Sequence, residues 1–142
     1  MQNPPPVQTT PSGVMAKSST GLDENVAALL SYVATWISGL VFFVIEKDSR
    51  LVRFHAMQSL ILSVVFFVGM IALWIAWVVI ALIAGQISGV LGTLVGIVVF
   101  LIILVFGLAC FVGWIMGMIK AFQGQYFKLP VIGNFAEKFS AK

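Results

Sequence analysis

Sixty consecutive residues, from Leu60 to Ile119, contain no charged side chain and no proline. A membrane-crossing helix needs about 20 mainly apolar residues, so this run is too long for one span and too short for three spans with their turns. Its most polar and glycine-rich stretch is GQISG at 85–89, where a turn is expected. We therefore predict two membrane spans, near 60–84 and 90–119.

The composition supports a membrane protein. Hydrophobic residues make up 61% of the 142 residues and charged residues 9%, whereas soluble domains carry about 45–50% and about 25%. A chain with so few polar side chains is expected to have lipid as its solvent. The eight Lys and Arg residues are not clustered with aromatic residues on one accessible face, so nucleic-acid binding is excluded as a function class.

A third span is predicted upstream, where residues 26–45 are twenty in a row without a charge. Thr20 begins a helix-capping pattern, so the helix is predicted to open there. The proline-rich residues 1–19 are expected to form a disordered tail. The predicted fold is therefore all-α, an integral membrane protein with three transmembrane helices in a single membrane domain over 20–142.

The C-terminal segment 120–142 alternates lysines with aromatic residues, which is typical of a chain lying along the lipid headgroups. Pro130 and Gly133 are expected to make a turn, followed by a brief amphipathic helix. We therefore predict an interfacial amphipathic segment after the last span.

Charge asymmetry predicts the orientation. With three spans, the 46–59 loop and the C-terminal segment share one side of the membrane, and only Lys17 lies on the other. The positive-inside rule then places the protein in the cell membrane with its C-terminus in the cytoplasm and its N-terminus outside. The seven cations of the cytoplasmic side are Lys47, Arg50, Arg53, Lys120, Lys128, Lys138 and Lys142.

The 46–59 loop holds the candidate functional residues. If it is helical, an apolar stripe that includes Leu51 and Phe54 runs beside Arg50 and Arg53, and Glu46 is spaced to pair with Arg50. Such a helix is expected to rest on the membrane surface, either as an anchor or as a docking site for an anionic lipid or a partner. The predicted cytoplasmic-face cluster consists of Glu46, Arg50, Arg53, His55 and Gln58.

Catalysis is not predicted. His55 is the only histidine and has no second ligand or oriented base within the pattern, so a hydrogen-bonding role is expected for it. The predicted spans hold no ionisable residue of the kind that marks proton relays and ion pathways. We predict a non-enzymatic protein with no cofactor and no metal site. The alternative is a passive channel or translocation component built from several copies, with a polar path of Ser31, Thr35, Ser38 and Ser63.

Small residues recur every four positions in the last predicted span, at Ala109, Gly113, Gly117 and Ala121. Such a smooth face lets helix backbones approach closely in lipid. Packing within one chain and packing between copies both explain the pattern. Because three spans bury few faces, a homo-oligomer is favoured.

Three stretches, at 24–33, 42–59 and 120–139, together resemble the small prokaryotic membrane proteins grouped with the magnetosome proteins MamF and MmsF. The most specific part is the EK…R-x-x-R-F-H-A-x-Q-S block, supported by LP-x-I-G near the C-terminus. The group is more distantly similar to the chloroplast import component Tic-twenty. The resemblance implies a multi-span membrane protein with no catalytic residues to carry over. Its magnetosome members are associated with crystal growth, and the chloroplast relative with protein translocation.

These observations together predict a non-enzymatic, oligomeric protein of structural or adaptor type. Its basic cytoplasmic face is expected to bind membrane lipids, or a membrane or cytoplasmic protein partner.

Overall fold

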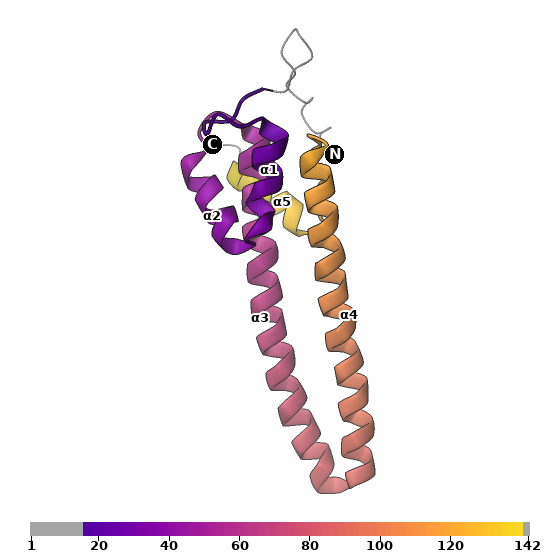
Figure 1. The fold of residues 1–142 in the computed structure, drawn as a ribbon. Helices are drawn as coiled ribbons and strands as arrows, with labels where there is room; N and C mark the ends of the chain where they lie inside the picture. Colours follow the sequence, from indigo (N-terminus) through magenta and orange to yellow (C-terminus); the bar gives the residue numbers. More distant parts are fainter. Residues whose placement is uncertain (1–15, 141–142) are drawn as a thin grey trace. The chain divides into compact units, whose positions relative to one another are not determined.

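Five helices form most of residues 16–140, the part of the chain that the computed structural model describes (Figure 1). By length and composition, α3 and α4 can each cross a membrane. The all-helical class predicted from the sequence is confirmed for these residues. In chain order the helices are α1 (Glu24–Val33), α2 (Trp36–Ile45), α3 (Arg50–Ile87), α4 (Gly89–Phe122) and α5 (Ile132–Ser140).

The predicted span over 26–45 is two helices of ten residues each, α1 and α2. Between them, Thr35 has a positive φ of 52°, which ends the helical path. The hydroxyl of Ser38 accepts the N–H of Ala34 at 3.0 Å and lies 2.9 Å from the carbonyl oxygen of Ser31. A ten-residue helix is about 15 Å long, half the thickness of a bilayer's apolar core of about 30 Å. The prediction of one continuous spanning helix here is therefore wrong.

The two short helices form a hairpin whose ends meet. The backbone N–H of Ser19 lies 3.0 and 3.1 Å from the two carboxylate oxygens of Glu46. The Ser19 hydroxyl lies 2.8 Å from carboxylate oxygens of both Glu46 and Asp48. Residues 16–19, predicted as part of the tail, are thus held in place, whereas residues 1–15 lie outside the described residues. We call residues 19–46 the α1–α2 hairpin.

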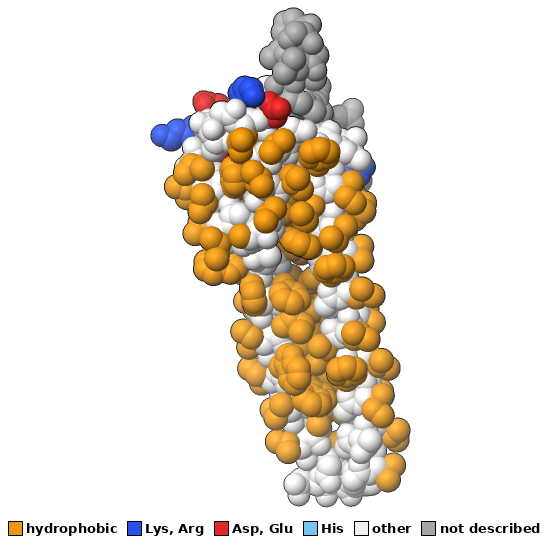
Figure 2. Space-filling view, in the orientation of Figure 1, with side chains coloured by type: hydrophobic (Ala, Val, Ile, Leu, Met, Phe, Trp, Pro, Cys, Tyr) orange, Lys and Arg blue, Asp and Glu red, His pale blue; other side chains and the backbone are white. Residues whose placement is uncertain are grey.

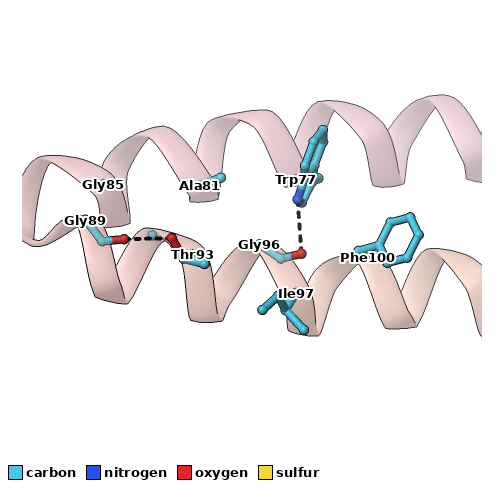
Figure 3. Close-up of a pocket in the computed structure, with 9 residues that line it drawn as sticks. Trp77, Ala81, Gly85, Gly89, Thr93, Gly96, Ile97 and Phe100 are labelled. Carbon is cyan, nitrogen blue, oxygen red and sulfur yellow. Dashed lines mark hydrogen bonds between the residues drawn. The ribbon is translucent and has the colours of Figure 1, made fainter.

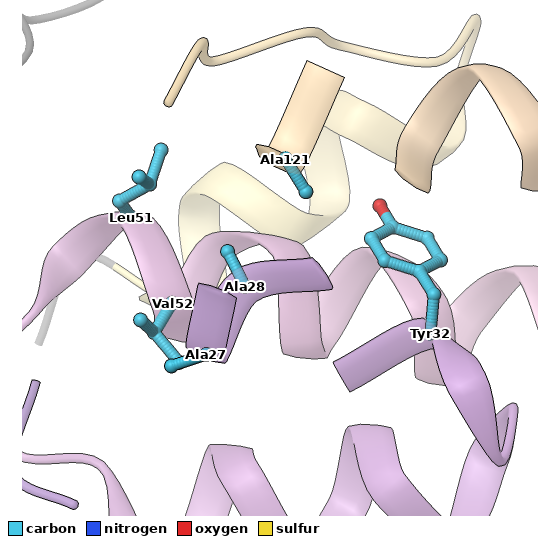
Figure 4. Close-up of a cluster of buried hydrophobic side chains, with 6 residues drawn as sticks. All are labelled: Ala27, Ala28, Tyr32, Leu51, Val52 and Ala121. Carbon is cyan, nitrogen blue, oxygen red and sulfur yellow. The ribbon is translucent and has the colours of Figure 1, made fainter. Parts of the chain in front are cut away.

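The chain divides into two compact units, residues 1–63 with 113–142 (unit 1) and residues 64–112 (unit 2). In unit 1, the first turns of α3 pack against α1 and the end of α4, with Leu51 and Phe54 only 2% and 1% exposed. The predicted stripe on the membrane surface is therefore wrong at these two residues: Leu51 belongs to the buried cluster with α1 and the end of α4, and Phe54 lies against the ring of Tyr126. The buried apolar cluster (Figure 4) consists of Ala27, Ala28, Tyr32, Leu51, Val52 and Ala121.

Two glycines permit close approach between helices of unit 1. A Cβ on Gly39 of α2 would lie 2.9 Å from the carbonyl oxygen of Ala56 in α3. A Cβ on Gly117 of α4 would lie 2.8 Å from ring atoms of Tyr32 in α1. Both positions exclude any larger side chain unless a neighbouring helix moves.

The short helix α5 follows a turn at 130–131, as predicted at Pro130, whereas Gly133 lies within the helix and not in the turn. Its buried face carries small residues, Gly133, Ala136 and Ser140. Its exposed face carries Phe135 and Phe139, each about half exposed. The helix is therefore amphipathic, with its large aromatic side chains pointing away from the rest of unit 1.

Unit 2 is an antiparallel pair formed by the parts of α3 and α4 on either side of Ser88, which lies within the predicted turn. The backbones approach closely where Gly92 meets Gly85, and the indole N–H of Trp77 donates to the carbonyl oxygen of Gly96 at 3.2 Å (Figure 3). Exposed apolar side chains cover both helices. In a membrane these side chains face lipid, whereas in water such a surface causes aggregation.

Candidate functional site

Glu46 is the last residue of the hairpin, shortly before α3, and is fully buried. Besides the contacts with Ser19, its carboxylate accepts the backbone N–H groups of Asp48 at 3.0 Å and Ser49 at 2.8 Å. Burial by itself raises the pKa of this carboxyl, but the hydrogen bonds from Ser49, Ser19 and Asp48 outweigh it and lower the pKa below its ordinary value. Glu46 therefore closes the hairpin as a carboxylate.

The predicted ion pair between Glu46 and Arg50 does not form, because the carboxylate is directed at backbone amides. Arg50 is exposed. Arg53 is half-buried, with its Nη1 donating to the carbonyl oxygen of Glu46 at 3.1 Å and its guanidinium 5.0 Å from the ring centre of Phe43. Its Nε is buried without a hydrogen-bond partner. Of the predicted cluster, these two arginines remain able to meet an anion.

His55 is fully buried and has partners at both ring nitrogens. Its Nε2 lies 2.9 Å from the carbonyl oxygen of Gln125, which only accepts, so Nε2 carries the hydrogen. Its Nδ1 lies 3.2 Å from the hydroxyl of Tyr32. A neutral imidazole satisfies both contacts, with Nδ1 accepting the hydroxyl hydrogen.

Gln58 completes a polar network with these groups. Its side-chain amide donates to the hydroxyl of Tyr32 at 3.0 Å and to the carbonyl oxygen of Phe127 at 3.1 Å. Its carbonyl oxygen accepts the N–H of Leu129 at 3.2 Å. The polar network, consisting of the side chains of Tyr32, His55 and Gln58, fastens the backbone of 125–129 to α1 and α3. His55 and Gln58 thus organise unit 1 and present no group to a ligand at its surface.

The serine hydroxyls of the alternative polar path bind the backbone. Ser31 donates to the carbonyl oxygen of Ala28 at 2.6 Å, and Ser63 to that of Ser59 at 2.9 Å. Ser38 bridges the break between α1 and α2, and the carbonyl oxygen of Thr35 accepts the hydroxyl of Ser59 at 3.1 Å. These hydrogen bonds account for the serines by local backbone pairing. Among residues 16–140, no group of three or more His, Cys, Asp or Glu side chains is arranged to hold a metal ion.

Three of the four residues on the predicted small-residue face are used within the chain. Gly117 lies against the ring of Tyr32, and Ala121 belongs to the buried cluster. A Cβ on Gly113 would lie 3.5 Å from the side chain of Leu129. Ala109 lies in unit 2 and is exposed.

Sequence reasoning missed Tyr32, Phe43 and Ser19. Tyr32 and Phe43 have a signal, since they fall in the stretches 24–33 and 42–59 that carry the family resemblance. Ser19 has none, because it lies in the polar segment assigned to the tail. Its role depends on Glu46, 27 residues later in the chain.

The chain has two long apolar helices, and all of its charged residues fall within the residue ranges of unit 1. Together these features define a helical, multi-pass membrane protein. Most of the charged side chains visible in Figure 2 gather where the hairpin begins and ends. Residues 21–136 match the magnetosome magnetite crystal formation protein family of MamF and MmsF, and the chain belongs to this family. The resemblance to MamF and MmsF seen in the sequence is thereby confirmed.

The relatives are archaeal proteins described as UPF0132 membrane proteins. One from Methanocaldococcus jannaschii is 40% identical over 89% of this chain and 96% of its own length. A second from the same organism is 36% identical over 84% of this chain and 71% of the relative. One from Archaeoglobus fulgidus is 36% identical over 82% of this chain and 95% of the relative. No solved structure matches the chain.

Proposed function

We propose that the chain is a non-enzymatic structural or adaptor protein of the cell membrane. Its basic cytoplasmic face binds anionic lipids of a membrane surface, or a protein partner. The observation that carries the proposal is the contact of Ser19 with Glu46, which brings the two ends of the α1–α2 hairpin together. A hairpin closed in this way enters and leaves the membrane on one side.

This contact supports a topology that differs from the one predicted from the sequence. Only α3 and α4 cross the membrane, joined at Ser88, and the hairpin dips into it without crossing. The N-terminal segment then lies on the same side as the C-terminal segment. This replaces the sequence-based prediction of an N-terminus outside the cell, because that prediction required residues 26–45 to cross.

The revised topology concentrates the charge further. All eight Lys and Arg residues fall on one side, and the turn around Ser88 on the opposite side has none. The positive-inside rule makes the charged side cytoplasmic. A surface with this excess of cations attracts anionic lipid headgroups, at about 1 kcal/mol per basic residue near the membrane.

Self-association is a further part of the proposal. A Cβ on Gly89 or Gly107 would have no neighbour within 4 Å, so among the described residues no contact within the chain accounts for a glycine at either position. Glycines without such a role are typical of positions where another helix approaches in lipid. We therefore place the contact between copies at these glycines and away from 113–121. Crosslinking in native membranes and the mass of the purified particle test it, and a monomer in both would remove this part.

Site-directed labelling tests the topology. In a Cys110→Ser background, single cysteines replace Thr20, Gln86 and Asn134, three exposed residues. An impermeant maleimide should label position 86 in intact cells, and positions 20 and 134 only after permeabilisation. Labelling of position 20 in intact cells would overturn the proposed topology.

Lipid binding tests the function. Purified protein should bind phosphatidylglycerol micelles more tightly than phosphatidylcholine micelles, with the difference shrinking as salt is raised. Equal binding of the two lipids at low salt would sink the proposal. Solute flux through liposomes that contain the protein would favour the passive channel instead.

A further inference from the structure

We propose that the corner between α2 and α3 binds the phosphodiester group of one anionic phospholipid, with Arg53 as the main ligand and Arg50 as the second cation. This inference rests on the proposed function, in which a basic face binds anionic lipids. It adds where on the protein the lipid binds and which side chains bind it. It also assigns the phosphodiester of the lipid to the arginines and its acyl chains to α2.

The guanidinium of Arg53 has one unused edge. Its Nη1 donates to the carbonyl oxygen of Glu46, and one face of the group lies over the ring of Phe43. Its Nε is buried without a partner, and its Nη2 has no hydrogen-bond partner among the described residues. The N–H groups on Nε and Nη2 point in parallel, with the spacing of two phosphate oxygens, and a two-pronged contact requires the side chains that cover Nε to move aside. Because a buried charged donor is costly to leave unpaired, an anion at this edge would stabilise the corner.

The carboxylates near this edge are bound by other donors, which leaves both arginines without a carboxylate partner. The carboxylates of Glu46 and Asp48 are both engaged by Ser19. The described ion pairs join Lys17 to Asp23 and Lys128 to Glu137, so neither Arg50 nor Arg53 has a carboxylate partner. Both arginines lie in the first turn of α3, where the helix dipole disfavours cations and favours anions. A bound phosphate would compensate for both effects.

The surface beside the arginines suits a lipid better than a free phosphate ion. Val41, Val44 and Ile45 of α2 are 47%, 65% and 44% exposed, and they belong to the same helix as Phe43. Helix α2 ends at Ile45, immediately before Glu46. A lipid with its phosphate on Arg53 therefore has apolar protein surface available for its acyl chains. The occupant we infer is amphipathic, with a phosphodiester as its polar group.

The test uses the full chain in neutral detergent micelles, with bound lipid counted by native mass spectrometry. The added probes are dioleoyl phosphatidylglycerol, dioleoyl phosphatidylcholine and inorganic phosphate. The variants are Arg53→Gln, Arg53→Lys, Arg50→Gln and Phe43→Leu. Lys138→Gln is the matched control, because it removes an exposed cation that belongs to α5 and to neither α2 nor α3.

Arg53→Gln should weaken phosphatidylglycerol binding about tenfold, because a charge-assisted, two-pronged contact is lost. Arg53→Lys should weaken it about threefold or more, since a lysine keeps the charge without the planar pair of donors. Arg50→Gln and Phe43→Leu should each reduce binding measurably, and Lys138→Gln should reduce it less than about twofold. Inorganic phosphate should bind far more weakly than the lipid.

Other outcomes separate the site from the general function. If the wild type prefers phosphatidylglycerol but Arg53→Gln and Lys138→Gln weaken binding equally, the site is wrong and the basic face stands. If the wild type shows no preference, the proposed function fails first. If inorganic phosphate binds as well as the lipid, the lipid assignment is overturned. Melting temperatures in lipid-free micelles identify variants that unfold. If Arg53→Gln unfolds, the site is tested by Arg50→Gln and Phe43→Leu, and unchanged lipid binding in both variants overturns it.

Discussion

The two units of this chain are held together by different kinds of contact. Unit 1 contains a buried polar network whose hydrogen bonds join residues 23 to 71 positions apart in the sequence. Unit 2 is a pair of helices that meet at glycines near the turn, with Trp77 donating one hydrogen bond to the backbone of Gly96. Unit 1 thus depends on specific partners, and unit 2 on close packing of small residues.

This difference shows where the family-like sequence matters. Few other side chains could replace the buried donors and acceptors of unit 1, because an unpaired polar group in an apolar setting is costly. The three stretches that carry the family resemblance, 24–33, 42–59 and 120–139, all lie in unit 1. The exposed apolar side chains of unit 2 have only to be soluble in lipid, so many sequences satisfy that requirement.

Gln58→Leu should cause the largest loss of stability. It leaves the carbonyl oxygen of Phe127 and the N–H of Leu129 each without a partner, and the hydroxyl of Tyr32 keeps only its contact with His55. With roughly 1–3 kcal/mol for each buried unpaired group, we expect a loss of about 3 kcal/mol or more. Thermal unfolding in detergent micelles measures it. The control is Gln86→Leu at an exposed position of unit 2, and equal losses for both variants would remove the contrast.

Two glycines of α4 provide a matched pair across the units. In unit 1, a Cβ on Gly117 meets the ring of Tyr32 at 2.8 Å, so Gly117→Ala should destabilise by about 1–3 kcal/mol through overpacking. In unit 2, a Cβ on Gly107 meets nothing within 4 Å, so Gly107→Ala should stabilise the monomer by up to about 1 kcal/mol. Unfolding in the same detergent gives both values. Opposite signs support the comparison, and a loss at Gly107 as large as that at Gly117 contradicts it.

The sequence predicted the parts of the fold that depend on local composition. The charge-free run predicts two long helices, and GQISG at 85–89 contains the residue where they join. The turn before the short C-terminal helix follows from Pro130 in the same way, although Gly133 lies within that helix. The break at Thr35 has no such signal, since neither Gly nor Pro marks it, and twenty uncharged residues look like a span. What closes the hairpin is a contact between Ser19 and Glu46, which local patterns do not report.

The candidate site was predicted in part for the same reason. The pattern around 46–59 identified five residues, and a hydrogen-bonding role was expected for His55. The partners of His55 are Tyr32 and Gln125, which lie 23 and 70 positions away, so no spacing rule names them. Similarly, the i, i+4 spacing predicts a pair of Glu46 with Arg50, but the carboxylate of Glu46 instead accepts the backbone N–H groups of Asp48 and Ser49, just before α3.

Glu46→Gln should cost about 1–2 kcal/mol at pH 7, because a side-chain amide replaces an acceptor that holds several N–H groups. The pKa of Glu46 is lowered on folding, so its contribution is fully present above its ordinary pKa of 4.5. That contribution is lost as the pH falls from 4.5 through the lowered value. Wild-type stability should therefore decline more steeply below pH 4.5 than that of the variant.

Unfolding measured between pH 7 and pH 3 tests this dependence, with Glu137→Gln as the control. Glu137 forms a partly exposed ion pair with Lys128, which is expected to contribute less than about 1 kcal/mol. If wild type and Glu46→Gln kept a constant difference down to pH 3, the carboxylate would not be what closes the hairpin of unit 1.

Trp77→Phe should have the smallest effect. It removes the indole N–H that donates to the carbonyl oxygen of Gly96, while the aromatic ring and the adjacent glycine contacts remain. Hydrogen bonds between helices in lipid contribute about 0.6 kcal/mol on average, so a loss of about 0.5–1 kcal/mol is expected in micelles. A loss above about 2 kcal/mol would mean that unit 2 also depends on one specific polar contact. The two units would then differ in how many such contacts they hold, and the kind of contact would be the same.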